Sequence, residues 1–293
     1  MSRKKYIVQI MGGLGNQLFQ YAYGRSLSLK YGADLFLDDS FFADYEWHDY
    51  SLKPFHLAAA LASADECAAL KTQPTGLMFR ICKKLGWAND PFIQESGLQY
   101  NEIYQRIKPS AYLSGYWQSE LYFAAVADAI RKELRIVIPP SEANAAMLQR
   151  IQQSNAVALH FRRGNFVNVP EVNKVHGTCS PEYYQAAIAY MCKRVTNPVF
   201  YVFSDDLAWA KAHLDMQYPT VFVDLNDAAH DYEDLRLMQH CKHQITANST
   251  FSWWGAWLNE HPEKIVIAPK QWFADPVKNQ QTINLVPESW VRL

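Results

Sequence analysis

Short runs of apolar and β-branched residues alternate with longer amphipathic stretches in the second half of the chain. The runs predict strands over 156–161, 199–203, 220–223, 243–246 and 264–268. The stretches between them predict helices over 181–194, 207–214, 232–241 and 251–261. Strands that alternate with helices of this length are typical of βαβ units, in which helices cover both faces of a parallel sheet. We therefore expect residues 141–293 to form one doubly wound α/β domain.

The first half begins with the same alternation. A strand over 6–11, a glycine loop over 12–16, a helix over 16–30 and a strand over 34–37 are expected. Further along, the pattern predicts a strand over 111–114 and a helix over 119–134, but it assigns no order to residues 40–110. Pro139 and Pro140 mark a linker, because paired prolines end regular structure. The pattern therefore predicts two α/β domains, 1–140 and 141–293, that face each other across a cleft.

Composition narrows the function classes. The 293 residues are 49% hydrophobic and 19% charged, with a net charge of −1, as in an ordinary globular protein. Nucleic acid is disfavoured as a partner, because binding a duplex requires a basic surface. Aromatic residues make up 14% of the chain, and aromatic rings stack on sugars and bases.

The start of the chain, its apolar stretches and its cysteines indicate where the protein is located. The basic start is followed by an apolar run too short for a signal peptide, and no stretch approaches the length of a membrane span. The five cysteines are scattered and include no C-x-x-C pair, which indicates reduced thiols and no zinc site. We expect a cytoplasmic protein, with peripheral association at the inner face of a membrane as an open alternative.

Polar residues follow four of the five strands predicted in the second half. They occupy the segments 160–165, 204–206, 224–227 and 247–252. Because ligands of open α/β sheets bind beyond the carboxyl ends of the strands, these segments predict a site at one edge of the sheet. Each segment alone could be an ordinary turn or helix cap.

The pair Arg162 and Arg163 is the most specific element of this edge. A guanidinium presents a fork of donors that fits phosphate oxygens, and Gly164 permits a close backbone approach. The alternative is a surface arginine pair tied to carboxylates. Asp205 and Asp206 suggest a magnesium site or, more economically, a helix cap with a ribose or base contact.

The glycine loop lies between a strand and a helix, as a phosphate-binding loop does. Gly13 and Gly15 match part of the dinucleotide fingerprint, but Leu18 replaces its third glycine, and Asp38 stands near the place of a ribose-binding acid. An NAD-dependent oxidoreductase or epimerase is therefore an alternative. A sugar-binding protein without catalytic activity is another.

Four motifs carry a family resemblance: residues 12–21 (GGLGNQLFQY), 160–164 (HFRRG), 203–206 (FSDD) and 248–255 (NSTFSWWG). Because the four motifs occur in the order typical of that family, the chain resembles the alpha-1,2-fucosyltransferase family, glycosyltransferase family 11. The resemblance implies a GT-B-type fold with a donor-binding C-terminal domain and an N-terminal domain on the acceptor side. It also implies inverting transfer of L-fucose from GDP-fucose to the 2-hydroxyl of a β-galactoside, on an oligosaccharide or glycolipid, without a metal or other cofactor. A fucosyltransferase that forms another linkage is the alternative within this class of enzyme.

The resemblance also implies roles for individual residues. Arg162 would bind the donor diphosphate and support catalysis, with Arg163 and His160 beside it. Asp205 would hold the guanosine part. The remaining donor-binding positions would be Gly13, Asn16, Asn248, Ser249 and Thr250.

The chain departs from the family pattern after the arginines, where Asn165 stands in place of the usual aspartate. An asparagine accepts no proton, so this position provides no general base. His176 and Glu171 are the candidate bases in the loop expected here, and His176 is favoured. The alternative for His176 is a capping role before the next helix. Of Trp253 and Trp254, one is expected in the core, and the other either packs there too or faces the cleft.

Overall fold

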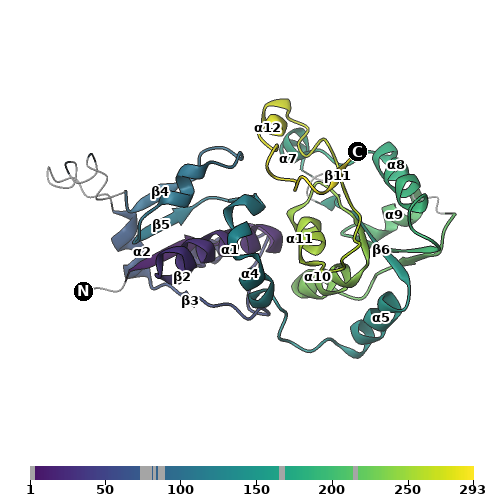
Figure 1. Ribbon diagram of the computed structural model, residues 1–293, viewed down its shortest axis with the longest axis horizontal. Helices are drawn as coiled ribbons and strands as arrows, with labels where there is room; N and C mark the ends of the chain where they lie inside the picture. Colours follow the sequence, from purple (N-terminus) through teal and green to yellow (C-terminus); the bar gives the residue numbers. More distant parts are fainter. Residues whose placement is uncertain (1–3, 73–80, 82–83, 85–89, 165–168, 214–216) are drawn as a thin grey trace. The chain divides into compact units, whose positions relative to one another are not determined.

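The computed structural model describes residues 4–72, 81, 84, 90–164, 169–213 and 217–293. Asn165 and Phe166 lie outside these residues. The chain divides into two compact units, Met1–Val137 and Ile138–Leu293. The boundary expected from the paired prolines follows residue 140, close to this division. Each unit contains a sheet flanked by helices (Figure 1).

The described part of the N-terminal unit has a five-stranded, all-parallel sheet in the order β3-β2-β1-β5-β4. Its strands are β1 (Lys5–Gln9), β2 (Asp34–Asp38), β3 (Ala60–Leu61), β4 (Phe92–Gln94) and β5 (Ala111–Ser114). Its α-helices are α1 (Leu14–Tyr31), α2 (Ala64–Lys71) and α4 (Ala127–Glu133). Short 3₁₀ helices cover Ser40–Ala43, Glu102–Arg106, Glu120–Tyr122 and Ala124–Val126.

Helices cover both faces of this sheet. Helix α1 presses so closely on β1 that a Cβ on Gly24 would lie 2.3 Å from Cγ2 of Val8. On the opposite face, Cys67 of α2 packs with Ile7 and Tyr112, all of them buried. Alternate residues of the central strand thus face opposite helices, as they do in doubly wound sheets.

The C-terminal unit has a six-stranded, all-parallel sheet in the order β11-β10-β9-β6-β7-β8. Its strands are β6 (Asn155–Phe161), β7 (Pro198–Ser204), β8 (Thr220–Phe222), β9 (His243–Ile245), β10 (Val266–Ala268) and β11 (Val291–Arg292). Its α-helices are α5 (Glu142–Gln152), α7 (Pro170–His176), α8 (Pro181–Cys192), α9 (Leu207–His213), α10 (Asp231–His240), α11 (Thr250–Leu258) and α12 (Pro276–Gln280). A 3₁₀ turn covers Ala228–His230.

Strand β6 is apolar on both faces because it lies between two helical layers. Val157, Leu159 and Phe161 pack with buried residues of α8, including Tyr184 and Met191. Ala156 and Ala158 point the other way, toward α5 and α10. The expected α/β fold of the GT-B type, with two Rossmann-like units, is confirmed in these two parallel sheets. No helix among the described residues is long and apolar enough to cross a lipid bilayer.

The single helix expected over 119–134 is wrong. Phe123 leaves the helical conformation, with φ of −137°, and its ring is fully buried 6.1 Å from the ring of Phe19. Two 3₁₀ turns therefore precede the short helix α4. Burial of this ring overrides a local preference for helix.

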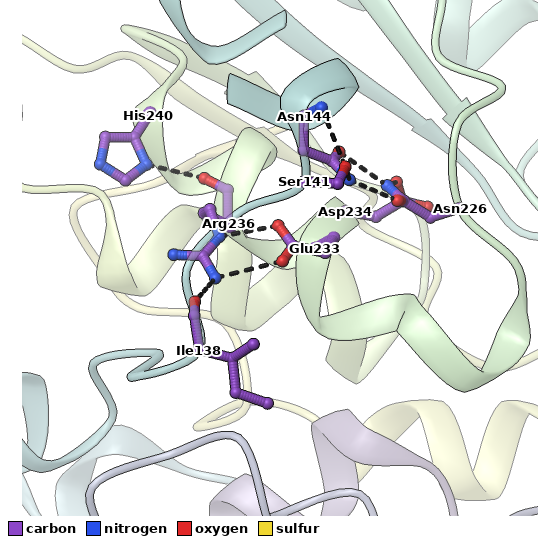
Figure 2. A network of polar contacts seen from close by, with 8 residues as sticks. All are labelled: Ile138, Ser141, Asn144, Asn226, Glu233, Asp234, Arg236 and His240. Carbon is purple, nitrogen blue, oxygen red and sulfur yellow. Dashed lines mark hydrogen bonds and ion pairs between the residues drawn. The ribbon is translucent and has the colours of Figure 1, made fainter. Parts of the chain in front are cut away.

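A polar network joins the start of the C-terminal unit to helix α10 (Figure 2). Arg236 pairs with Glu233 at 2.7 Å and donates a further hydrogen bond to the carbonyl of Ile138. In a neighbouring group, Asn226 donates to Asp234 at 2.7 Å and exchanges hydrogen bonds with Asn144. The network fixes the residues after the interdomain linker on the body of the C-terminal unit.

Two carboxyl groups at the start of α10 hold their protons more tightly than usual. Burial and then the nearby Asp234 raise the pKa of Asp231 to about 7. Burial raises the pKa of Asp234 to about 6, against the opposing effect of the hydrogen bond from Asn226. Both carboxyls therefore bind more protons in the folded chain than in the unfolded chain between roughly pH 4 and pH 7.

This proton binding predicts a pH-dependent effect of Asp231→Asn. A raised folded-state pKa of an acid destabilises the folded chain as pH rises, so removing the carboxyl helps most at high pH. We expect the melting temperature of the variant, relative to wild type, to increase between pH 5 and pH 8. Thermal unfolding at both pH values measures this difference. Asp224→Asn, at an exposed carboxylate, should show no such trend, and an equal trend in both variants would contradict the assignment.

Candidate active site

The arginine motif and the Asn-Ser-Thr motif meet where the C-terminal sheet reverses its strand order. The chain runs outward from β6 through β7 to β8 and then returns to β9, which pairs with the other edge of β6. The carboxyl ends of β6 and β9 thus form a topological switch point, the place where open α/β sheets bind ligands. Arg162 follows β6, and Ser249 follows β9.

The Asp205 carboxylate holds the arginine motif in place. Its Oδ2 accepts from Nη1 of Arg162 at 2.8 Å, and its Oδ1 accepts from the backbone N–H of Arg163 at 2.8 Å. A Cβ on Gly164 would lie 2.4 Å from the same Oδ2, so this close approach requires glycine. Arg162 is still 26% exposed. The guanidinium is therefore oriented in advance and accessible to an anion.

Arg163 is fixed by a different set of contacts. Its guanidinium carbon lies 3.8 Å from the ring centre of Trp209, and Nε lies 3.4 Å from Asp206 Oδ2. Asp206 also accepts from the backbone N–H of Trp209 at 3.0 Å, which caps the start of α9. Arg163 thus packs against α9, next to Arg162 in the chain. Its supporting role at the donor stays a prediction.

His160 is buried on β6 as a neutral imidazole. It is 5% exposed and lies 5.8 Å, ring centre to ring centre, from Phe251 of α11. Burial and then the charge of Arg162 lower its pKa to about 3. Within the described part of the chain, its Nδ1 has no hydrogen-bond partner. The histidine contributes a polar atom, without a positive charge, beneath the arginine motif.

The N-terminus of α11 lies at the same switch point. Ser249 is its N-cap residue, half-buried, and its side chain makes no capping hydrogen bond. Thr250 is the first residue of the nine-residue helix. The dipole of a helix favours an anion at its N-terminus. Contact of the Ser249 and Thr250 hydroxyls with phosphate stays a prediction.

Asn248 has a role different from the expected contact with the donor. Its Nδ2 lies within 3.1–3.2 Å of the carbonyls of His176, Gly177 and Trp272. Its Oδ1 accepts from the Cys179 thiol at 3.6 Å. The side chain is buried, and its hydrogen-bonding groups are occupied by the loop between α7 and α8, so Asn248 positions that loop.

Both candidate bases lie on a short helix, and the expectation of a loop there is wrong. Pro170 starts α7 because its fixed φ suits the first helical position, and Gly177 ends it with φ of +61°. Glu171 is exposed in the first turn. His176, in the last turn, is half-buried, with its ring 5.1 Å from that of Phe273.

The environment of His176 keeps its imidazole neutral. Burial, and then the charges of Lys278 and Arg162, lower the pKa of His176. The histidine and Asn248 also line a cavity of about 450 Å³ that extends to Tyr183 and Lys270. A neutral imidazole beside open volume can accept a proton.

The glycine loop of the N-terminal unit is held by two buried amides. Gln17 donates to the carbonyls of Gly12 and Asp49, both at 2.8 Å, and Gln20 accepts from the N–H of Met11 at 2.9 Å. Gly13 is the N-cap of α1. Asn16, in the first turn, accepts from Gln118 at 2.9 Å. The structure places Gly13 and Asn16 at the start of α1, in the N-terminal unit.

Asp38 is unavailable for a ribose. It is 3% exposed, accepts from the Tyr112 hydroxyl at 2.6 Å and pairs with Lys71 at 3.1 Å. These hydrogen bonds outweigh the effect of burial and hold the pKa of this carboxyl well below its usual range. Asp38 therefore does not provide the ribose contact that a dinucleotide bound at the glycine loop would require.

Trp253 and Trp254 are both fully buried, so neither ring is a surface for stacking.

Three residues that the sequence analysis did not single out hold parts of the candidate site in place. They are Trp209, which contacts Arg163, and Gln17 and Gln20, which hold the glycine loop. Gln17 and Gln20 belong to the motif 12–21 and lie three residues apart on one face of a helix, whereas Trp209 lies in none of the four motifs. Among the described residues, no group of three histidine, cysteine or acidic side chains is arranged to hold a metal ion.

Comparisons with known proteins identify the family of the chain. The profile of glycosyl transferase family 11 matches residues 96–293. The chain is 33% identical to an alpha-1,2-colitosyltransferase of Escherichia coli, over 98% of each chain, and 30% identical to the O-antigen biosynthesis glycosyltransferase WbnK of the same species, over 97% and 99%.

A solved structure, that of a point mutant of Arabidopsis thaliana FUT1 in complex with GDP, is similar in fold. Its TM-score is 0.54 at 10% identity, over 90% of this chain and 70% of that one. The mouse galactoside 2-alpha-L-fucosyltransferase Sec1 is 25% identical over 86% of this chain and 64% of its own length. The profile match and the full-length bacterial relatives show that the chain belongs to glycosyltransferase family 11.

Proposed function

We propose that the chain transfers L-fucose from GDP-β-L-fucose to the 2-hydroxyl of a terminal β-galactoside, with inversion at the anomeric carbon and without a metal ion. The observation that carries the proposal is the Asp205-held pair Arg162 and Arg163, at a switch point that also contains a helix N-terminus. The acceptor is a galactose-terminated oligosaccharide or glycolipid.

Charge development explains the use of this site. As the bond from the anomeric carbon to the β-phosphate oxygen breaks, its electron pair moves to GDP. Arg162 and the N-terminus of α11 stabilise that growing charge because they are already oriented toward an anion. Asp205 keeps the guanidinium in place, so little reorganisation accompanies the step.

The acceptor oxygen forms the new bond to the anomeric carbon and loses its proton to a base. His176 is the proposed base, because its pKa is lowered and its imidazole is neutral near pH 7. Glu171 is the alternative, on the exposed first turn of the same helix. Gly13 and Asn16 would contribute from the N-terminal unit, toward the β-phosphate or the fucose.

The relatives support a second candidate, transfer of a colitosyl group. The alpha-1,2-colitosyltransferase is 33% identical over nearly the whole chain. The same arginine site would serve either donor, since it contacts the diphosphate and not the sugar. Cytoplasmic localisation, with or without peripheral association at a membrane, remains a prediction.

Release of GDP distinguishes these cases. We expect release from GDP-fucose to increase when lactose or N-acetyllactosamine is added, and to be equal in EDTA and in Mg²⁺. An activated colitose donor, tested in parallel, decides between the two sugars by the ratio of kcat/KM. Loss of release in EDTA, with recovery on adding Mg²⁺, would contradict metal independence.

A further inference from the structure

The N-terminal sheet has a switch point of its own. The chain runs from β1 outward to β2 and β3, and it returns through β4 to β5, which pairs with the other edge of β1. The loops after β1 and β5 are therefore neighbours at a ligand-binding edge. Gln118, after β5, donates to Asn16, after β1, at 2.9 Å.

The turn after β5 is strained and firmly held. Trp117 has φ of +54°, a left-handed conformation that is rare for a bulky residue. Glu95 Oε2 accepts from the backbone N–H groups of Tyr116 and Trp117, at 2.7 and 2.9 Å, and the Trp117 ring is stacked 4.2 Å from that of Tyr23. Strain of this kind is retained mainly where function requires it. The held turn fixes the backbone of Tyr116, and 38% of the surface of this residue is exposed.

Aromatic side chains from the segment after β2 gather at the same edge. The ring of Tyr45 lies 6.4 Å from Trp47 and 6.2 Å from His48. His48 covers the glycine loop, because a Cβ on Gly13 would lie 3.3 Å from its Cε1. The Gln118–Asn16 hydrogen bond at 2.9 Å ties the loop that carries Tyr116 to the glycine loop. Burial and then the Tyr45 hydroxyl raise the pKa of Tyr116. We call Tyr45, Trp47, His48 and Tyr116 the aromatic platform.

The charge around the platform identifies the kind of ligand. The segment 39–50 carries no lysine or arginine, and its acidic residues are Asp39, Asp44, Glu46 and Asp49. Carboxylates repel a nucleoside diphosphate, whereas they accept hydrogen bonds from hydroxyl groups. Trp47 is 50% exposed and so presents a large apolar ring to solvent. A neutral ligand with both hydroxyl groups and apolar C–H faces satisfies both features.

We propose that the aromatic platform binds a pyranose ring of the sugar acceptor, beside the glycine loop. The inference rests on the proposed function for the identity of the acceptor. The rings of Trp47 and Tyr116 contact the C–H face of the sugar, and the nearby carboxylates and His48 accept its hydroxyl groups. Glu95 is a positioning residue, because it fixes the turn that carries Tyr116.

The test is the kinetic behaviour of Trp47→Ala and Tyr116→Ala in the full chain. We expect each to raise the KM for lactose by about tenfold, the size of a lost aromatic contact. The rate of GDP-fucose hydrolysis without acceptor and the Kd for GDP should not change. Tyr218→Ala removes a tyrosine of similar exposure, 40%, from the C-terminal unit, and it should leave all three quantities unchanged.

The outcomes separate this inference from the proposed function. If wild type transfers fucose and both platform variants keep its KM for lactose, the inference is overturned and the function stands. If wild type transfers no fucose, the function fails, and saturation-transfer NMR with lactose then tests the platform directly. Binding by wild type that is lost in Trp47→Ala supports the platform, whereas equal binding by both, or none by wild type, overturns it.

Discussion

Replacing Arg162 by alanine is expected to lower kcat/KM for GDP-fucose by about 10²–10³-fold, the usual cost of removing one oriented donor from a developing anion. The substitution has a second effect in this site. Asp205 loses the partner at 2.8 Å that neutralises it, and its carboxylate would then repel the diphosphate. Arg162→Ala/Asp205→Ala should therefore recover part of the lost donor affinity, and initial rates with varied GDP-fucose measure both variants.

Arg194→Ala is the matched control for Arg162. Arg194 is exposed at the end of α8, with its guanidinium carbon 3.6 Å from the ring centre of Tyr190. Like Arg163, it is positively charged and packs on an aromatic ring, but it lies outside the switch point. We expect near wild-type kinetics from this variant. Similar losses in Arg162→Ala and Arg194→Ala would show that the effect is one of general charge or stability.

Arg236→Ala is expected to destabilise the C-terminal unit by about 3–5 kcal/mol, the cost of leaving a buried charge without its partner. Glu233 is only 4% exposed, and its partner Arg236 is 9% exposed. The variant also removes the hydrogen bond to the Ile138 carbonyl at the start of the unit (Figure 2). Thermal and denaturant-induced unfolding, followed by circular dichroism, measure the change.

Two further variants identify the cause of that loss. Glu233→Gln/Arg236→Met removes both charges and should recover much of the stability, because a buried pair can be replaced by neutral groups at small cost. Lys211→Ala breaks the exposed pair with Asp224, at 4.0 Å, and should change stability by less than about 1 kcal/mol. A loss as large in Lys211→Ala as in Arg236→Ala would contradict the role of burial.

The central strands β6 and β7 of the C-terminal unit could be predicted from sequence because they are buried on both faces. Continuous apolar runs such as 156–161 and 199–203 leave little ambiguity about strand identity. The polar residues after them then define the site, since all parallel strands end at one edge. The same reasoning predicts that Arg162 and Asp205 lie together, and their side chains pair at 2.8 Å.

Other features depend on contacts that a sequence pattern does not contain. Strands β3, β4 and β11 are two or three residues long and leave no periodic signal. The amide of Asn248 satisfies three distant carbonyls, at His176, Gly177 and Trp272. No local pattern distinguishes that role from ligand binding. The aromatic platform could not be predicted from the sequence either, because its residues are distant in the chain and strand pairing in the N-terminal sheet brings them together.

The product of a reaction between GDP-β-L-fucose and lactose tests the central claim most directly. Two-dimensional NMR of the purified product reports the donor sugar, the linkage position and the anomeric configuration together. We expect a single α-linked fucose on the galactose 2-hydroxyl, formed at the same rate with EDTA present. A fucose on another hydroxyl, a β-linkage, or no product despite GDP binding would contradict the proposed function.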